Sequence, residues 1–369
     1  MKRLYKTAPA RHIILLISGA VICLFHIFKH NSNIMAALAE KFVRPLRMTL
    51  SFASSAVSFS VAEILIALAA AALLIYLVKE ICGMFTQKIK GLWKTLYRIL
   101  LTAVTVVAAI YAGFCLLWGI YYYGDDFVGK SGLKDENIAV EQLEAVTNYF
   151  ANLADEYSGR VRRDYSVICE MDREVILDRS DEIYREVVKT FPCLKGPDVK
   201  AKGIKCSEIM SLMRFTGFYF PFTAEANVNM KSPSFMLPVT VAHELAHCRG
   251  VAKEQEANFV AIIACMRNGN DEYVYSASLM AYDYLAAALK KDKYDAWQKI
   301  NGDLNNDVKR DLAADNYYWS QYKTAMGKTS DAVYEGFLKS YDQELGLKSY
   351  GACVDLLVNY YYPMVKEHS

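Results

Sequence analysis

Residues 237–250 read LPVTVAHELAHCRG, and the interpretation of the whole chain starts from this stretch. Within it, His243, Glu244 and His247 form the pattern His-Glu-x-x-His. Positions four apart share one face of a helix, so both imidazole rings can reach one metal ion while Glu244 points toward the open side of that metal. Gly250 fits the left-handed end of such a helix. The stretch predicts a zinc-binding helix with a general base; the plainer alternative is a helix with two incidental histidines.

Zinc in a catalytic site takes three protein ligands and leaves its fourth position to water, so a third ligand is needed. The other histidines lie at the first apolar segment or beside the carboxyl end, and they are His12, His26, His30 and His368. None of them is close in sequence to residues 237–250. The third ligand should therefore be a carboxylate.

Residues 253–269, KEQEANFVAIIACMRNG, predict a second helix that supplies this carboxylate. Glu254 and Asn258 are one turn apart on one face, whereas Glu256 points away from that face. We expect Glu254 to be the third zinc ligand and Asn258 to accept a ring N–H from one of the two histidines. Glu256 is the alternative ligand, and a solvated helix start with acidic first-turn residues is the alternative interpretation of the run.

Another stretch, TGFYFPFTAEANVN at residues 216–229, interrupts the helical pattern. It is aromatic and β-prone, and Pro221 is excluded from a central strand, so the stretch predicts an edge strand or an extended loop. An extended substrate would lie against such a strand, with Asn227 and Asn229 as candidate substrate contacts. An aromatic core strand followed by a turn is the alternative.

Three apolar segments near the amino terminus are long enough to cross a bilayer. They cover residues 12–28, 57–78 and 99–123, and the third ends in Trp118 and in Tyr121, Tyr122 and Tyr123, a cluster typical of an interfacial aromatic belt. A cleaved signal peptide is the alternative for the first segment, although its apolar run is long for such a peptide. The chain is therefore expected to have the lipid bilayer as a partner.

Lys and Arg residues are distributed unevenly around these segments. The amino terminus has four and the 79–98 loop has five, whereas the 29–56 loop has four and the stretch after residue 123 opens with Asp125 and Asp126. This bias predicts a cytoplasmic amino terminus and an extracytoplasmic location for residues from 124 onward. Glu63 would then be an interfacial carboxylate on the side of the large domain, favoured there by the helix dipole.

Residues 124–369 suffice for one sizeable domain. Apolar residues at spacings of three and four predict an amphipathic helix over 136–158. Similar patterns predict helices at about 180–191, 271–290, 305–325, 328–344 and 347–361. We therefore expect a mainly α protein, in which three N-terminal transmembrane helices precede a helix-rich domain with a small β element.

Composition narrows the function classes further. Lys+Arg 42 against Asp+Glu 40 gives a net charge of +2, which argues against a nucleic-acid binder that works through a basic surface. A hydrophobic fraction of 54% and a mean hydropathy of +0.10 exclude intrinsic disorder and agree with membrane segments. Among nine cysteines no CxxC pair occurs, and a bridge such as Cys193 to Cys206 is compatible with an extracytoplasmic domain, although pairing cannot be deduced from sequence.

The motifs HELAH at 243–247 and EQEAN at 254–258 resemble those of the gluzincin peptidases, in which a downstream Glu-x-x-Ala-Asp or Glu-x-x-Ala-Asn completes the site. Together with the three apolar segments, the stretches GFYFPFTAEANVN, HELAHCRG, EQEANF and SYGACVDLLVNYY resemble a bacterial family of three-span membrane proteins with a zinc-peptidase-like domain. This resemblance implies a zincin-like fold for 124–369, a Zn²⁺ site and a place in the bacterial cell membrane, but no substrate. Asn258 stands where the prenyl-protease type has aspartate, which weakens its expected hydrogen bond.

Two function classes follow. The first is a membrane-anchored zinc metallopeptidase that hydrolyses a peptide bond of an envelope protein or peptide, with Glu244 taking a proton from a zinc-activated water and giving it to the leaving amine. The second is a catalytically silent zinc-site protein that binds an envelope partner or ligand. Glu244 favours the enzyme, because a structural site needs no general base and is normally closed by four ligands.

Overall fold

The computed structural model describes residues 8–85, 89–134, 136–343 and 350–367. Four basic residues that support the predicted orientation lie outside these ranges, as does one histidine; they are Lys2, Arg3, Lys6, Lys88 and His368. The described chain is mainly helical with a small three-stranded sheet, as the sequence predicts. The first part of a predicted helix at 347–361 also falls outside the described residues.

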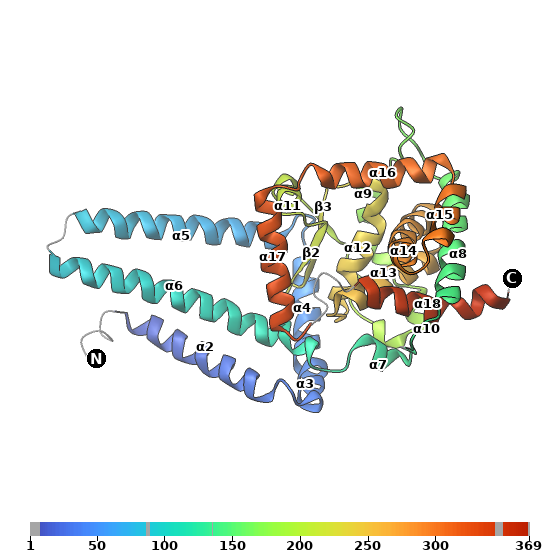
Figure 1. The fold of residues 1–369 in the computed structure, drawn as a ribbon. Coiled ribbons are helices and arrows are strands. Elements are labelled where there is room, and N and C mark those ends of the chain that lie inside the picture. Colours follow the sequence, from blue (N-terminus) through green and yellow to red (C-terminus); the bar gives the residue numbers. More distant parts are fainter. Residues whose placement is uncertain (1–7, 86–88, 135, 344–349, 368–369) are drawn as a thin grey trace.

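Three helices are long and apolar enough to cross a membrane among the residues that the structure describes: α2 (Pro9–Phe28), α5 (Val61–Phe85) and α6 (Ile89–Leu117). They project together from one side of the remainder, with α2 packed along α6 (Figure 1). Their apolar side chains are largely exposed, as expected of surfaces that face lipid. The chain is thus a membrane-associated protein by the length and composition of these helices.

The segment between α2 and α5 is helical rather than an open loop. It forms α3 (Ser32–Leu38), a π-helical turn (Ala39–Val43) and α4 (Arg44–Ser54). Asn31 caps α3 by accepting the backbone N–H of Ile34. Both helices lie against the large domain (Figure 1), so this segment contributes side chains to the interior.

The third apolar segment ends differently from the prediction. Helix α6 stops at Leu117, and Gly119–Tyr122 form a 3₁₀ turn in which the aromatic side chains are buried. The expected belt of Trp118, Tyr121 and Tyr122 at a lipid interface is therefore wrong. These rings pack inside the protein, because the chain turns into the domain directly after the span.

The large domain consists of short and long helices around three strands. The helices that precede the sheet or interrupt it are α7 (Phe127–Ser131), α8 (Val140–Ser158), α9 (Arg173–Asp178), α10 (Val187–Thr190) and α11 (Ser207–Leu212), with 3₁₀ turns at Ser180–Glu182 and Pro192–Leu194. After it come a 3₁₀ turn at Ser234–Met236, α12 (Leu237–Cys248), α13 (Glu254–Asn268), α14 (Asp271–Asp292), α15 (Tyr294–Asp303), α16 (Asn306–Ser320), α17 (Ala325–Ser340) and α18 (Tyr350–Glu367). Helix α13 is buried on most sides and packs between α12, α14 and α18.

Most of the predicted helices are present, with ends shifted by a few residues. The exception is 180–191, which is not one helix but a 3₁₀ turn followed by the single turn of α10. Its periodic apolar residues are nevertheless buried: Ile183, Tyr184 and Val187 lie in the core, and the Tyr184 hydroxyl donates to the Ala242 carbonyl. The apolar spacing of residues 180–191 therefore predicted correctly which side chains are buried, although two short turns bury them in place of one continuous helix.

The sheet has the order β1-β3-β2 and consists of β1 (Lys202–Ile204), β2 (Gly217–Phe220) and β3 (Glu225–Asn229). Strand β1 is parallel to β3, while β2 is antiparallel to it, with Gly217 opposite Val228 and Phe220 opposite Glu225. The 216–229 stretch is thus a hairpin. Its first strand is at the edge of the sheet, as predicted, and its second is central.

A buried carboxylate joins this hairpin to the start of α5. Glu225 accepts the backbone N–H groups of Val61 and Ala62 at 3.1 and 2.7 Å, and the ammonium group of Lys202 at 2.6 Å. Glu63, in the first turn of α5, accepts the backbone N–H groups of Lys205 and Cys206. The first turn of α5 is therefore fixed to the domain by carboxylate–amide bonds, and Glu63 does face the large domain as expected.

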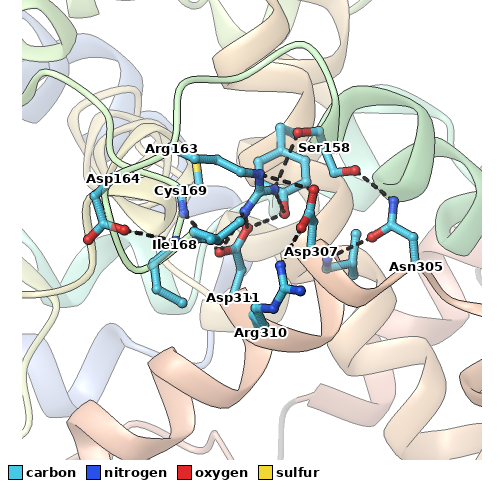
Figure 2. Close-up of polar contacts among 12 residues, drawn as sticks. Ser158, Arg163, Asp164, Ile168, Cys169, Asn305, Asp307, Arg310 and Asp311 are labelled. Atoms are coloured by element: carbon cyan, nitrogen blue, oxygen red, sulfur yellow. Dashed lines mark hydrogen bonds and ion pairs between the residues drawn. The ribbon is translucent and has the colours of Figure 1, made fainter.

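A second buried carboxylate ties α16 to the loop after α8 (Figure 2). Asp311 is fully buried and accepts Arg163 Nη1 at 3.1 and 3.2 Å and the backbone N–H of Cys169 at 2.9 Å. Asn305, just before α16, donates to Ser158 Oγ at 2.7 Å. Asp311 is paired with Arg163 and lies outside the cavity described below, so we assign this cluster a structural role. All nine cysteines, each within the described ranges, are free thiols, so the bridge between Cys193 and Cys206 that the sequence left open is absent.

Candidate metal centre

Two consecutive helices bring the predicted ligands together. Helix α12 begins with Pro238 in its first turn and is followed by Gly250, whose φ of +89° is the left-handed conformation that glycine adopts readily. The chain then reverses, and α13 starts at Glu254. Helices α12 and α13 pack against each other, so the first turn of α13 faces the second half of α12.

His243, His247 and Glu254 form a cluster whose ligand atoms all lie within 4.8 Å of one another. His243 Nε2 is 3.1 Å from His247 Nε2 and 3.2 Å from Glu254 Oε2, and His247 Nε2 is 3.7 Å from Glu254 Oε1. Two nitrogens held at about 2.0–2.1 Å by one tetrahedral zinc lie about 3.3 Å apart. Two imidazoles and one carboxylate at this spacing therefore fit a catalytic zinc site with a fourth position open.

The ring of His247 is held in the tautomer that a metal ligand needs. Its Nδ1 is 2.7 Å from the carbonyl oxygen of Val251, which can only accept, so Nδ1 carries the proton and Nε2 presents its lone pair to the cluster. His243 Nδ1 is buried without a hydrogen bond of normal geometry, and Asn258 stands close enough to raise the pKa of that ring. Asn258 thus lies beside His243, but the predicted hydrogen bond from a ring N–H to its side chain is not formed with normal geometry.

Charge within the cluster is strongly coupled. Burial acts to raise the pKa of Glu254, but its hydrogen bond with His243 and the charges of both rings outweigh burial and lower that pKa to about 2. Burial acts to lower the pKa of His243, and the facing Glu254 carboxylate reverses this and raises it. Burial lowers the pKa of His247 to about 4. At neutral pH Glu254 is therefore ionised and His247 is neutral, which are the forms that bind a metal, whereas His243, with a pKa raised to about 8, has to lose a proton on binding.

Glu244 lies beside the cluster and is not one of its members. Its side chain is buried, its Oε2 has no hydrogen-bond partner, and it lines the same cavity as the three donors. Burial raises the pKa of Glu244 to about 8. A free carboxylate oxygen beside a three-donor cluster is the position that the predicted general base requires.

Glu256, the alternative ligand, points elsewhere. Its carboxylate accepts the backbone N–H of Phe127 at 3.0 Å and that of Val128 at 3.5 Å, at the start of α7. Burial raises its pKa to about 7. Within the described residues the two acidic positions of the first turn of α13 thus separate, with Glu254 at the cluster and Glu256 at α7.

Asn227 and Asn229 do not line the cavity, and the prediction that they contact a substrate is wrong. Both are fully buried in β3, the central strand. Asn227 accepts the hydroxyl of Ser60 at 2.6 Å, and the Asn229 amide donates to the hydroxyl of Ser211 and the carbonyl of Phe215. Both amides are therefore used to join elements of the fold.

Three side chains that the sequence did not indicate complete the surroundings. The Tyr334 hydroxyl of α17 donates to Glu254 Oε1 at 2.6 Å. Arg47 of α4 is buried and donates to the His247 carbonyl at 2.5 Å, and Trp118 packs edge-on against the His247 ring with centroids 5.5 Å apart. No spacing rule links these positions to the motif, so no sequence signal could have found them.

The cluster opens into a cavity of about 480 Å³. One wall is apolar and comes from the end of α6 and from β2, including Phe114, Trp118 and Phe218. Residues of α14, α16 and α17 also line it and carry carboxylates at Asp283, Asp315 and Asp331. The donors therefore lie inside a cleft large enough for several residues of an extended peptide.

Comparison with known proteins gives a family without an assigned activity. The family model described as a protein of unknown function (DUF3810) matches residues 39–358, which include the second and third apolar helices and nearly all of the large domain. No curated protein and no solved structure matches the chain. Because the match covers most of its length, the chain belongs to the DUF3810 family.

Proposed function

We propose that this chain is a membrane-anchored, zinc-dependent metallopeptidase that hydrolyses a peptide bond of an envelope protein or peptide. The observation that carries the proposal is the position of Glu244, which lines the cavity next to three donors spaced for one zinc ion and has a buried Oε2 without a hydrogen-bond partner. A structural zinc site has no use for such a carboxylate. Two histidines and a glutamate as the donor set also agree with a hydrolytic site.

His243, His247 and Glu254 would hold the zinc, which when bound supplies a Lewis acid that lowers the pKa of a water and polarises a carbonyl. Glu244 takes a proton from the water while the oxygen of that water forms a bond to the carbonyl carbon of the substrate. Glu244 then delivers that proton to the leaving nitrogen as the C–N bond breaks, so that a carboxylic acid and an amine are released. Strand β2 lies at the sheet edge beside Glu244 and offers main-chain groups to an extended substrate.

The large domain is proposed to lie outside the cytoplasm of a bacterial cell. The distribution of Lys and Arg around the three apolar helices supports this orientation. The end of α2, the start of α5 and the end of α6 all lie at the domain, and this arrangement supports three spans that separate the start of α2 from the domain.

The test compares envelope peptides from cells that carry the wild type, Glu244→Gln or Glu208→Gln. Glu208 is an exposed glutamate of α11 and serves as the matched control. We expect peptide products with the wild type and the control, none with Glu244→Gln, and about one zinc per chain in all three purified proteins. Proteolysis by Glu244→Gln would refute the mechanism. Zinc binding without any wild-type product would favour the catalytically silent alternative.

A further inference from the structure

The metal cluster lies directly beside the end of a candidate membrane span. The apolar window of α6 runs from Gly91 to Leu117, and Phe114 within it lines the cavity. Trp118, one residue beyond the helix, contacts the ring of His247. The cavity therefore begins at the level where α6 leaves the bilayer, rather than on a face of the domain remote from the membrane.

The β2–β3 hairpin contacts two of the three candidate spans. At its turn, the Phe222 ring packs so closely against Gly113 of α6 that a Cβ at this glycine would lie 2.8 Å from the ring. Directly after the turn, Glu225 accepts the first N–H groups of α5, at Val61 and Ala62. The hairpin turn is thus fixed at the membrane end of the domain.

Strand β2 leads from this turn to the general base. Its far end, Gly217, lies so close to Glu244 that a Cβ there would be 2.6 Å from Oε1. Aromatic side chains continue along the same path, with ring centroids 6.5 Å apart for Phe218 and Phe220 and 5.4 Å apart for Phe220 and Phe222. Within the described sheet only β3 pairs with β2, so its other edge is open to an added strand. From Phe220 to Gly217 the strand spans about 10 Å.

The charge of the cavity distinguishes between the molecules that could enter from this side. Acidic residues outnumber arginine and lysine residues in its lining, which includes Glu244, Glu254, Asp283, Asp315 and Asp331 against Arg214. This excess of acidic residues disfavours anionic phospholipid headgroups. A polypeptide that leaves the bilayer beside α6 meets the aromatic side chains of α6 and β2, and the acidic residues of the same cavity suit its solvated continuation.

We propose that the substrate is a polypeptide held in the bilayer by its own spanning segment and cut in its extended juxtamembrane stretch, about three to six residues outside that segment. This inference rests on the proposed peptidase activity and names its substrate class. The added strand would run along β2 from the level of Phe222 to Glu244. A soluble peptide lacks the anchor that brings this stretch to the cavity at a high effective concentration.

The experiment uses the full chain with zinc in vesicles of phosphatidylcholine and phosphatidylglycerol, together with two single-span reporter libraries. Both carry a randomised segment of about eight residues, placed directly after the span in one and beyond a Gly/Ser linker of about 20 residues in the other. We expect cleavage close to the span and at least about tenfold slower cleavage beyond the linker. Equal rates for the two libraries would overturn the inference, and cleavage of neither would contradict the peptidase activity itself.

A binding readout that needs no turnover separates the two claims. In the Glu244→Gln background, a photo-crosslinking residue in place of Phe220 should capture the span-attached reporter and leave the linker reporter uncaptured. The same residue in place of Tyr165, a fully exposed side chain in the segment between α8 and α9, is the control. Capture at Phe220 without cleavage by the wild type would contradict the proposed peptidase activity and support the proposed substrate-binding surface along β2. Equal capture at both positions would overturn the inference.

Discussion

Glu244 keeps its position through close packing against a glycine. The Cα of Gly217 lies so near that an added Cβ would be 2.6 Å from Glu244 Oε1, 2.8 Å from its Cγ and 2.9 Å from the carbonyl oxygen of Asn227. Contacts this short have to be relieved by a shift of the strand or of the carboxylate. The edge strand can approach Glu244, the proposed general base, only because residue 217 has no side chain.

Gly217→Ala is therefore expected to displace Glu244 and leave the three donors in place. The predicted result is a fall in kcat of at least about tenfold, because general acid–base catalysis depends on the position of the carboxylate. Zinc content should stay that of the wild type. Steady-state kinetics on a cleaved peptide, with metal analysis of the same sample, checks this; unchanged kcat would show that the close contact has no functional role.

Tyr334 contacts Glu254, the proposed third metal ligand. Its hydroxyl holds Glu254 Oε1 at 2.6 Å, and partners of this kind commonly change metal affinity by about 10–100-fold. We expect Tyr334→Phe to weaken zinc binding by about tenfold while thermal stability of the zinc-free protein changes little. A chelator competition titration measures this. Wild-type affinity in Tyr334→Phe would mean that Glu254 is positioned by α13 alone.

The sequence predicted those residues of the candidate site that lie close together along the chain. His243, His247 and Glu254 lie on two consecutive helices, so helical periodicity and one short turn define their convergence. Arg47 precedes His247 by 200 residues and Tyr334 follows Glu254 by 80, and contacts over such separations depend on tertiary packing that no local pattern reports.

At the scale of elements, buried carboxylates join helix starts to distant segments. Glu256 of α13 accepts two N–H groups at the start of α7, and Glu225 of β3 does the same at the start of α5. The first N–H groups of a helix have no partner within it, so an ionised carboxylate there satisfies donors and interacts favourably with the helix dipole.

Glu256→Ala should separate structure from metal binding. Removing the carboxylate leaves the Phe127 N–H without its acceptor and is expected to lower the free energy of unfolding by about 1–3 kcal/mol, with zinc stoichiometry unchanged. Glu254→Ala should lose zinc instead. Denaturant unfolding in detergent and metal analysis of both variants check this pair, and loss of zinc in Glu256→Ala alone would reverse the ligand assignment.

Sequence patterns predicted which segments form helices and strands better than they predicted where those elements lie in the fold. The three apolar helices follow from length and composition alone. The 216–229 stretch was correctly predicted to contain an edge strand, which is β2. Its second half forms the central strand β3, because β1, at residues 202–204, pairs with the other side of β3. The predicted helix at 180–191 was wrong, since apolar periodicity reports burial and a pair of turns buries the same side chains.

At the scale of the whole molecule, the apolar helices and the large domain share one interior. A cluster of buried side chains takes Phe25 from α2, Met35 from α3, Cys115 from α6, Ala252 from the turn before α13 and Tyr341 from the end of α17. Arg47 and Trp118 reach His247 across the same junction. The cavity is therefore completed by residues that precede 124, which is why each test uses the full chain.

Labelling of an exposed thiol can show on which side of the membrane the large domain lies. Cys206 lies on the surface of the domain next to Glu63, at the domain end of α5. A membrane-impermeant thiol reagent is expected to label it in intact spheroplasts and to leave a Cys206→Ser variant less labelled by one site per chain. Labelling of Cys206 only in inside-out vesicles would place the domain in the cytoplasm and contradict the proposed orientation.

We propose that His243, His247 and Glu254 together coordinate one zinc ion. The most direct test of this proposal is the zinc content of the purified full chain after equilibrium dialysis, compared with that of Glu254→Gln and Glu244→Gln. We expect about one zinc per chain for the wild type and for Glu244→Gln, and little for Glu254→Gln. A wild type without zinc, or a Glu254→Gln variant that binds it as well as the wild type, would contradict the account.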